Sequence, residues 1–286
     1  DLEYNYLIEF ASLPDLETTS LSIPLDRLNL LTMTLDYPDF RRIKGIELQK
    51  RSEIYQRRYE NAVRSFQHAD AYRWNDRLLA LGPTSNLYQE KAALCRHAGQ
   101  ISPAIEFYRL AAEHADTPHQ EALCWITAAL LGTLVNGEVD HEGIELIRAA
   151  LRCCARRHYK GEEPVHVVVL KQIVHETAMW DNTALSTQFL QVFVEEFVSM
   201  GLPGNPALLI GEVFLGYGLS TEARQWLQAA LEGSETPSEK ARILCMIGVS
   251  FLVEGGHQAA CERFERAQEA EPEYSEAYAG MAQCHT

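Results

Sequence analysis

The sequence predicts an all-α chain built from antiparallel helical hairpins. Apolar residues recur three and four positions apart along nearly all of the 286 residues, which is the spacing of one helix face. Turn residues such as Asn136-Gly137 and Gly255-Gly256 interrupt this pattern at short, similar intervals. No run alternates between apolar and polar residues as a half-buried strand would. Short turns between helices are therefore the expected connections.

A pattern of 34 residues is clearest near the C-terminal end, from Ala241 to Tyr274. Its apolar and small residues stand at set positions, and Pro272 closes the second helix. The positions from 4 to 27 hold Leu244, Ile247, Gly248, Phe251, Ala260, Phe264 and Ala267. This stretch resembles the tetratricopeptide repeat family position by position. The resemblance implies a right-handed superhelical solenoid, in which small residues let two helices approach and large ones fill the space between hairpins.

The first two segments of the chain lie outside the clear pattern. Residues 1–37 form an apolar N-terminal arm, which we expect to cover the first hairpin as a cap; a place along the groove of the solenoid is the alternative. Residues 38–84 form a basic helical segment, interpreted as a degenerate hairpin. In it, Ala62, Phe66 and Ala69 repeat the spacing of a second helix, although a turn glycine is missing before them.

Residues 85–286 are predicted to form the solenoid itself. The segments 85–118 and 204–237 are looser copies of the pattern, with Lys91 and Glu235 as departures from it. The middle segments, 119–157 and 164–200, keep only the helix-pair shape. The clear copy, 241–274, is followed by a half-repeat over 275–286. We expect either further repeats after this half-repeat, or self-association through its exposed apolar face.

The charge of the chain is acidic and unevenly placed. There are 40 Asp and Glu residues against 25 Lys and Arg residues, and the formal net charge is −15. Ten Lys and Arg residues against six Asp and Glu residues give residues 38–80 a charge of +4. Nucleic acid and anionic membranes attract clustered cations, so we expect neither as a partner. The basic segment is interpreted as a solvated helix face with ion pairs, and a phosphate-binding patch is the alternative.

No residue pattern predicts catalysis, a cofactor or a metal site. The glycine-rich run 201–206 lacks the Lys of a phosphate-binding loop, and His175-Glu176 lacks the second His of a zinc motif. Seven unpaired cysteines in helical patterns indicate reduced thiols and a cytoplasmic location, although the chain begins with Asp1 and a lost targeting segment stays open. The longest charge-free apolar run, 122–137, is shorter than the roughly 20 residues of a membrane span.

The resemblance implies that a ligand would lie on the concave face made by the first helices. Carried over position by position, this face has a mixed apolar and polar composition. Its candidate partner-binding residues are Gln89, Arg96, Trp125, Leu208, Glu212, Arg242, Cys245 and Val249. The Lys and Asn clamp with which chaperone-binding members hold a C-terminal carboxylate is absent from these positions.

These observations favour a noncatalytic scaffold that binds a segment of another protein in its groove, through apolar anchors and a few charge contacts. A second hypothesis is that the chain is the repeat domain of a larger enzyme or signalling protein, with catalysis or DNA binding encoded outside it. A third is a regulator that binds a small peptide.

Overall fold

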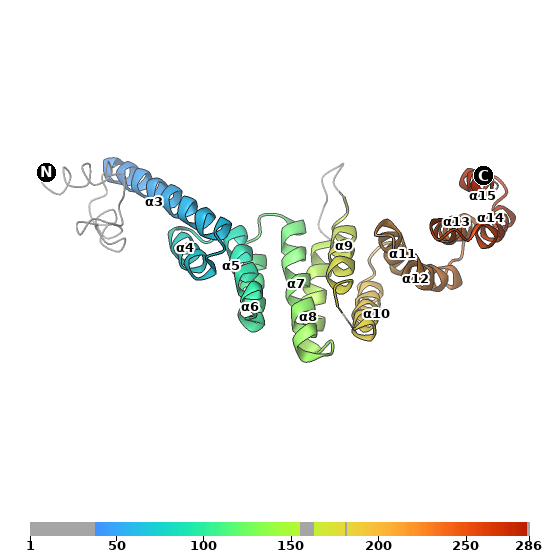
Figure 1. Ribbon diagram of the computed structural model, residues 1–286, viewed down its shortest axis with the longest axis horizontal. Helices are drawn as coiled ribbons and strands as arrows, with labels where there is room; N and C mark the ends of the chain where they lie inside the picture. The colour runs from blue at the N-terminus through green and yellow to red at the C-terminus, as the bar shows by residue number, and fades with distance from the viewer. Residues whose placement is uncertain (1–37, 155–162, 181, 285–286) are drawn as a thin grey trace, which may run out of the picture. The chain divides into compact units, whose positions relative to one another are not determined.

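The computed structural model describes residues 38–154, 163–180 and 182–284, with side chains from Leu48 onward. All thirteen helices in these ranges are α-helices, and no strand occurs there. Figure 1 labels the helices in chain order. The predicted all-α class is confirmed. The N-terminal arm, 1–37, lies outside the described residues.

The contacts divide the chain into two units, Asp1–His114 and Ala115–Thr286, called here the N-terminal and the C-terminal unit. The N-terminal unit contains two helix pairs, α3 (Pro38–Arg64) with α4 (His68–Leu81) and α5 (Ser85–His97) with α6 (Ile101–Glu113). The hairpin predicted over 85–118 therefore packs on the helix pair before it within this unit, through α4 and α5.

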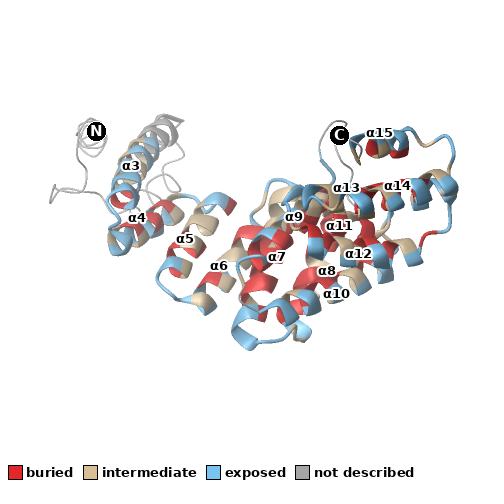
Figure 2. Cartoon of the chain, turned by 45° about the vertical axis from the view of Figure 1, so that its right-hand side comes forward, coloured by how far each residue is buried: buried red, intermediate tan, exposed pale blue. Residues whose placement is uncertain are grey.

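The C-terminal unit contains four further pairs and a final single helix. In three of these pairs the two helices pack closely on each other, while in the second pair, over 165–199, they meet at few positions. The last helix packs on the pair before it. The members are α7 (Pro118–Asn136) and α8 (His141–Cys154), α9 (Val165–Thr177) and α10 (Thr183–Ser199), α11 (Pro206–Gly216) and α12 (Ser220–Glu232), α13 (Pro237–Val253) and α14 (His257–Ala270), and α15 (Ser275–Cys284). Figure 2 shows that buried residues are concentrated on helices such as α7, α8 and α11.

The helix starts follow from capping side chains. The side chains of Thr84, Thr117, Asn182, Asn205 and Thr236 each accept a hydrogen bond from a backbone N–H in the first turn of the next helix. Such a bond satisfies one of the donors that a helix start leaves without a partner in the helix. Three of the helices also begin with Pro, whose fixed φ suits the first turn.

One turn recurs at the tips of several hairpins. Gly99, Gly218 and Gly255 have φ values of 72°, 75° and 77°, the left-handed region where a side chain is strained. After each glycine, the next backbone N–H bonds the carbonyl five residues earlier, as Gln100 does to Cys95 at 2.8 Å. This is the Schellman arrangement, which ends one helix and starts the return helix within a few residues.

The first hairpin makes the same turn without a glycine. Phe66 has a φ of 55°, and the N–H of Gln67 bonds the carbonyl of Ala62 at 2.8 Å. Phe66 is therefore a turn residue with 80% of its surface exposed, and the prediction that it lies in the core of a second helix is wrong. The buried second-helix residues are instead Ala71, Trp74, Asn75 and Leu78 of α4.

Replacing Phe66 with Gly is expected to raise the free energy of unfolding of the N-terminal unit by about 1 kcal/mol. Left-handed backbone strains an L-residue by about 1–2 kcal/mol. A glycine has more conformational freedom in the unfolded chain, which reduces the gain in stability by about 0.5–1 kcal/mol. Urea unfolding followed by circular dichroism measures the difference. Phe66→Ala is the control, because it removes the same exposed ring and keeps the Cβ atom. Equal stability changes in the two variants would contradict the strain explanation.

Candidate functional site

The first helices of successive pairs form one face of the C-terminal unit. α7 packs on α9, α9 on α11, and α11 on α13, so these helices are neighbours in chain order. This surface is called the inner face below. Side chains that point outward from it are the ones that a partner segment can contact.

A hollow of about 400 Å³ lies on the inner face between α9 and α11. Its walls combine aliphatic and aromatic groups with one cation and one carboxylate. The lining residues are Val167, Lys171, Leu209, Glu212, Val213, Gly216 and Tyr217. A pocket with mostly apolar walls and a few charged groups is typical of sites that hold a side chain of a ligand.

An ion pair and a hydrogen bond join α11 to α13 beside this hollow. The Arg242 guanidinium of α13 pairs with the Glu212 carboxylate of α11. The side-chain amide of Asn205, the N-cap of α11, also donates to Glu239 of α13 at 3.4 Å. Lys171 of α9 pairs with Glu163, which lies just before the same helix. Two predicted partner-binding residues thus contact each other and hold α11 beside α13.

Two other predicted residues of the inner face lie beneath its surface. Leu208 and Cys245 are buried in the structure, and burial raises the pKa of the Cys245 thiol to about 11. The thiol therefore stays protonated near neutral pH and acts as a small apolar group. Val249 is exposed on α13, and Trp125 of α7 is partly buried.

The remaining two predicted residues, Gln89 and Arg96, belong to α5 in the N-terminal unit. The Gln89 amide donates to the Ser85 hydroxyl at 3.1 Å. The structure therefore groups Trp125, Leu208, Glu212, Arg242, Cys245 and Val249 in one unit and separates these two from them.

Sequence reasoning missed Lys171, Leu209, Val213 and Tyr217, which line the hollow. The segment 164–200 lacks a clear repeat signature, so its inward positions could not be assigned. Tyr217 stands at the C-terminal cap of α11, beyond the positions that the resemblance marks as inward. An aromatic residue directly before the turn glycine Gly218 is the one signal in the sequence that could have found it.

Metal sites and membrane-spanning helices are two further classes of feature. Among the residues that the structure describes, no group of three or more His, Cys, Asp or Glu side chains could hold a metal ion. Within the same ranges, no helix combines the length and the apolar character that crossing a membrane requires.

No protein-family model matches the chain, and neither does any curated protein. Solved structures similar to it include pilF of Pseudomonas aeruginosa, with 14% identity over 82% of this chain and 99% of that chain and a TM-score of 0.35. The P58(IPK) TPR domain has 13% identity over 99% of this chain and 78% of that chain, also with a TM-score of 0.35. A tetratricopeptide repeat protein from Parabacteroides merdae has 12% identity over the full length of both chains and a TM-score of 0.32.

The fold is assigned from the way the helices of this chain pack on each other. In α11 and α13, Gly211 and Gly248 lie against Leu227 and Phe264 of their return helices, and a Cβ atom at either glycine would come within 2.6 Å and 2.8 Å of those side chains. Close approach at a small residue of the first helix is what the tetratricopeptide pattern implies. The described part of the chain therefore has a tetratricopeptide-like fold of antiparallel helical hairpins.

Proposed function

We propose that the chain is a noncatalytic scaffold that binds a segment of another protein on the inner face of the C-terminal unit. The observation that carries this proposal is the hollow between α9 and α11, where apolar side chains, among them the exposed Tyr217, lie beside charged ones. Tyr217 at the end of α11 and Val249 and Val253 on α13 are large, exposed apolar residues. Val249 and Val253 are four residues apart and share one face of α13.

The charged groups on this face determine which charges a partner segment should carry. Lys171 and Glu212 lie within the same hollow, and Arg242 lies beside Glu212. Apolar contacts of the partner then supply most of the affinity. Its charged side chains pair with these three groups and so fix the position of the segment along the face. We expect a segment that carries apolar anchors and charges of both signs.

Substitution of Tyr217 or Val249 by Glu is expected to weaken partner binding about 30-fold. Loss of one anchor of an interface costs about 2 kcal/mol or more, and each 1.4 kcal/mol is a factor of ten. The measurement is quantitative affinity capture with purified wild-type and variant chains from an extract of the source cells. Each captured protein is compared across the chains.

Val198→Glu is the matched control, because Val198 is exposed on the second helix α10 and receives the same new charge. Leu208→Glu is not suitable, since a charge at that buried position would unfold the unit. Circular dichroism shows that the variants keep their helices. Undiminished capture by both Tyr217→Glu and Val249→Glu would exclude the inner face as the binding surface.

A further inference from the structure

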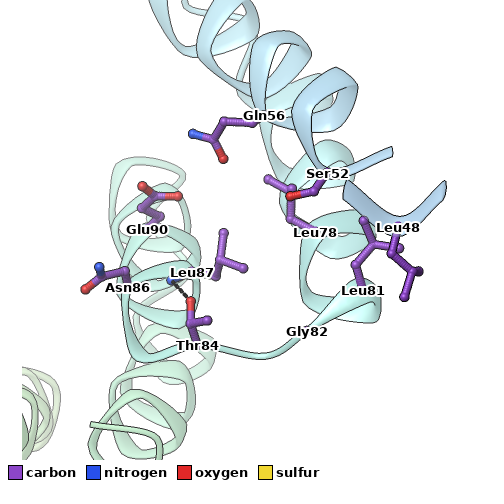
Figure 3. Close-up of a pocket in the computed structure, with 10 residues that line it drawn as sticks. All are labelled: Leu48, Ser52, Gln56, Leu78, Leu81, Gly82, Thr84, Asn86, Leu87 and Glu90. Atoms are coloured by element: carbon purple, nitrogen blue, oxygen red, sulfur yellow. Dashed lines mark hydrogen bonds between the residues drawn. The ribbon is translucent and has the colours of Figure 1, made fainter. Parts of the chain in front are cut away.

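A second hollow lies in the N-terminal unit, between α3, α4 and α5. Its volume is about 490 Å³, within the range of about 300–1,000 Å³ that is usual for ligand pockets. Figure 3 shows the side chains of α3 and α4 on one side of it and those of α5 on the other. This site is separate from the inner face of the C-terminal unit.

The hollow exists because α3 and α5 do not pack closely. α4 packs on both of them, but α3 and α5 meet at a few positions at most. Gly82 ends α4, and Thr84 caps α5 two residues later, accepting a hydrogen bond from the N–H of Leu87 at 3.3 Å. This short connection fixes α5 beside α4 and leaves the space between α3 and α5 to side chains.

Most of the wall of the hollow is aliphatic. Leu48 comes from α3, Leu78 and Leu81 from α4, and Leu87 from α5. Leu48, Leu81 and Leu87 are only partly buried, so apolar surface remains exposed to the hollow. An apolar group placed there would remove this surface from water, which favours binding by about 25 cal/mol per Å².

Glu90 of α5 is the one charged residue that lines the hollow among the described residues, and Gln56 of α3 lies near it in Figure 3. Burial and the nearby Glu60 carboxylate raise the pKa of Glu90, and a hydrogen bond from the Tyr59 hydroxyl partly offsets this rise. The Oε2 atom of Glu90 is buried and has no hydrogen-bond partner among the described residues. An acceptor in that state costs free energy that a donor would recover.

We propose that this hollow binds a segment of a partner protein that places a Lys or Arg side chain next to a leucine-like side chain. The cation pairs with the Glu90 carboxylate and donates to its oxygen, and the aliphatic groups lie against the leucines. An acidic segment would meet the negative charge of Glu90, and a purely apolar one would leave the Oε2 atom of Glu90 without a donor.

Glu90 is partly buried on the same helix as Leu87, so a cation that pairs with its carboxylate is screened less than at a fully exposed site. Charges in a poorly solvated site attract each other more than charges in water do. The preference for a cation is therefore a property of Glu90, whereas the apolar part of the affinity belongs to the leucines. Removal of the charge alone separates the two contributions.

The test uses the full chain and a library of random twelve-residue peptides displayed on phage. Panning on the wild-type chain is expected to enrich peptides that have Lys or Arg beside Leu, Ile or Met. Synthetic copies of these peptides are expected to bind Glu90→Gln about tenfold more weakly than wild type. Replacing the peptide Lys by norleucine should weaken binding to wild type about tenfold and leave binding to Glu90→Gln unchanged.

Three further variants show whether the peptides bind in this hollow and distinguish a loss of binding from a loss of folding. Glu113→Gln removes an exposed carboxylate from α6 in the same unit and should leave binding unchanged. Leu81→Lys places a cation in the hollow and should abolish binding of the selected peptides, while circular dichroism confirms the helices. Tyr217→Glu should have no effect, so failure here and failure at the inner face are distinguishable. A selection without Lys or Arg, or equal binding to Glu90→Gln, overturns the proposal.

Discussion

Phe264→Ala is expected to lower the free energy of unfolding of the C-terminal unit by about 3–5 kcal/mol. The Phe264 ring is 1% exposed and lies at the centre of a cluster formed by α13, α14 and α15. Truncation leaves a cavity that the glycine backbones around it cannot fill. Urea unfolding measures the loss, and amide hydrogen exchange over α13–α15 shows whether these helices open first. Phe66→Ala, the same substitution at an exposed turn, should change stability far less.

The space for the Phe264 ring depends on two glycines. A Cβ atom at Gly248 or Gly280 would lie 2.8 Å or 2.4 Å from the ring carbons. Gly280→Ala is therefore expected to destabilise the wild-type chain by about 1–3 kcal/mol and to be tolerated once Phe264 is Ala. Gly132→Ala is the control, because a Cβ atom there meets nothing within 4 Å. An equal penalty for Gly280→Ala in both backgrounds would contradict the close contact.

The packing of Gly280 also bears on the expectation that the final helix has an uncovered apolar face. The half-repeat pattern marks Tyr278 and Met281 as an uncovered apolar face. In the structure Met281 packs against the cluster around Phe264, while the hydroxyl of Tyr278 donates to the Pro272 carbonyl at 2.8 Å. Part of the expected free face is thus used within the chain, and self-association through it stays a prediction.

Helix pairs were predictable because their signals are local. A helical period and a glycine at a turn depend on residues close in the chain, and Gly99, Gly218 and Gly255 all mark turns that the structure contains. The spacing of Ala62, Phe66 and Ala69 misled because the same backbone turn forms with Phe in place of Gly. Matching residue types alone cannot distinguish a core position from a strained turn.

The candidate site was less predictable because it depends on how neighbouring hairpins pack. A position rule fixes the direction of a side chain relative to its own hairpin. It does not tell whether the neighbouring helices will bury that side chain, as happens at Leu208 and Cys245, or leave it exposed, as at Val249. The hollow that contains Lys171 and Tyr217 arises only when α9 and α11 are placed side by side.

Lys91 shows how a distant residue can rescue a poor match to the repeat. It stands at a core position of α5 and is 8% exposed, yet its ammonium reaches the Asp76 carboxylate of α4. The rings of Tyr72 and Phe107 lie 4.7 Å and 4.5 Å from the nitrogen. Cation–π contact and an ion pair together compensate for the loss of water around the charge.

Asp76→Ala is expected to destabilise the N-terminal unit by about 2 kcal/mol, because the buried Lys91 ammonium loses its counter-charge. The value lies below the usual 3–5 kcal/mol for a buried pair, since the Asp76 side chain is 47% exposed and solvent screens it. Lys91→Met removes the charge instead, keeps the volume, and is expected to change stability by less than about 1 kcal/mol. Urea unfolding compares the two variants at low and high salt.

The double variant Asp76→Ala with Lys91→Met decides between an ion pair and simple packing. If the ammonium is the source of the penalty, removing Asp76 has almost no effect once Lys91 is Met, so the two changes do not add. Packing alone would give additive changes, with Lys91→Met and Asp76→Ala each contributing in full. Additivity, or a larger penalty for Lys91→Met than for Asp76→Ala, would show that the charge of Lys91 is not what ties α5 to α4.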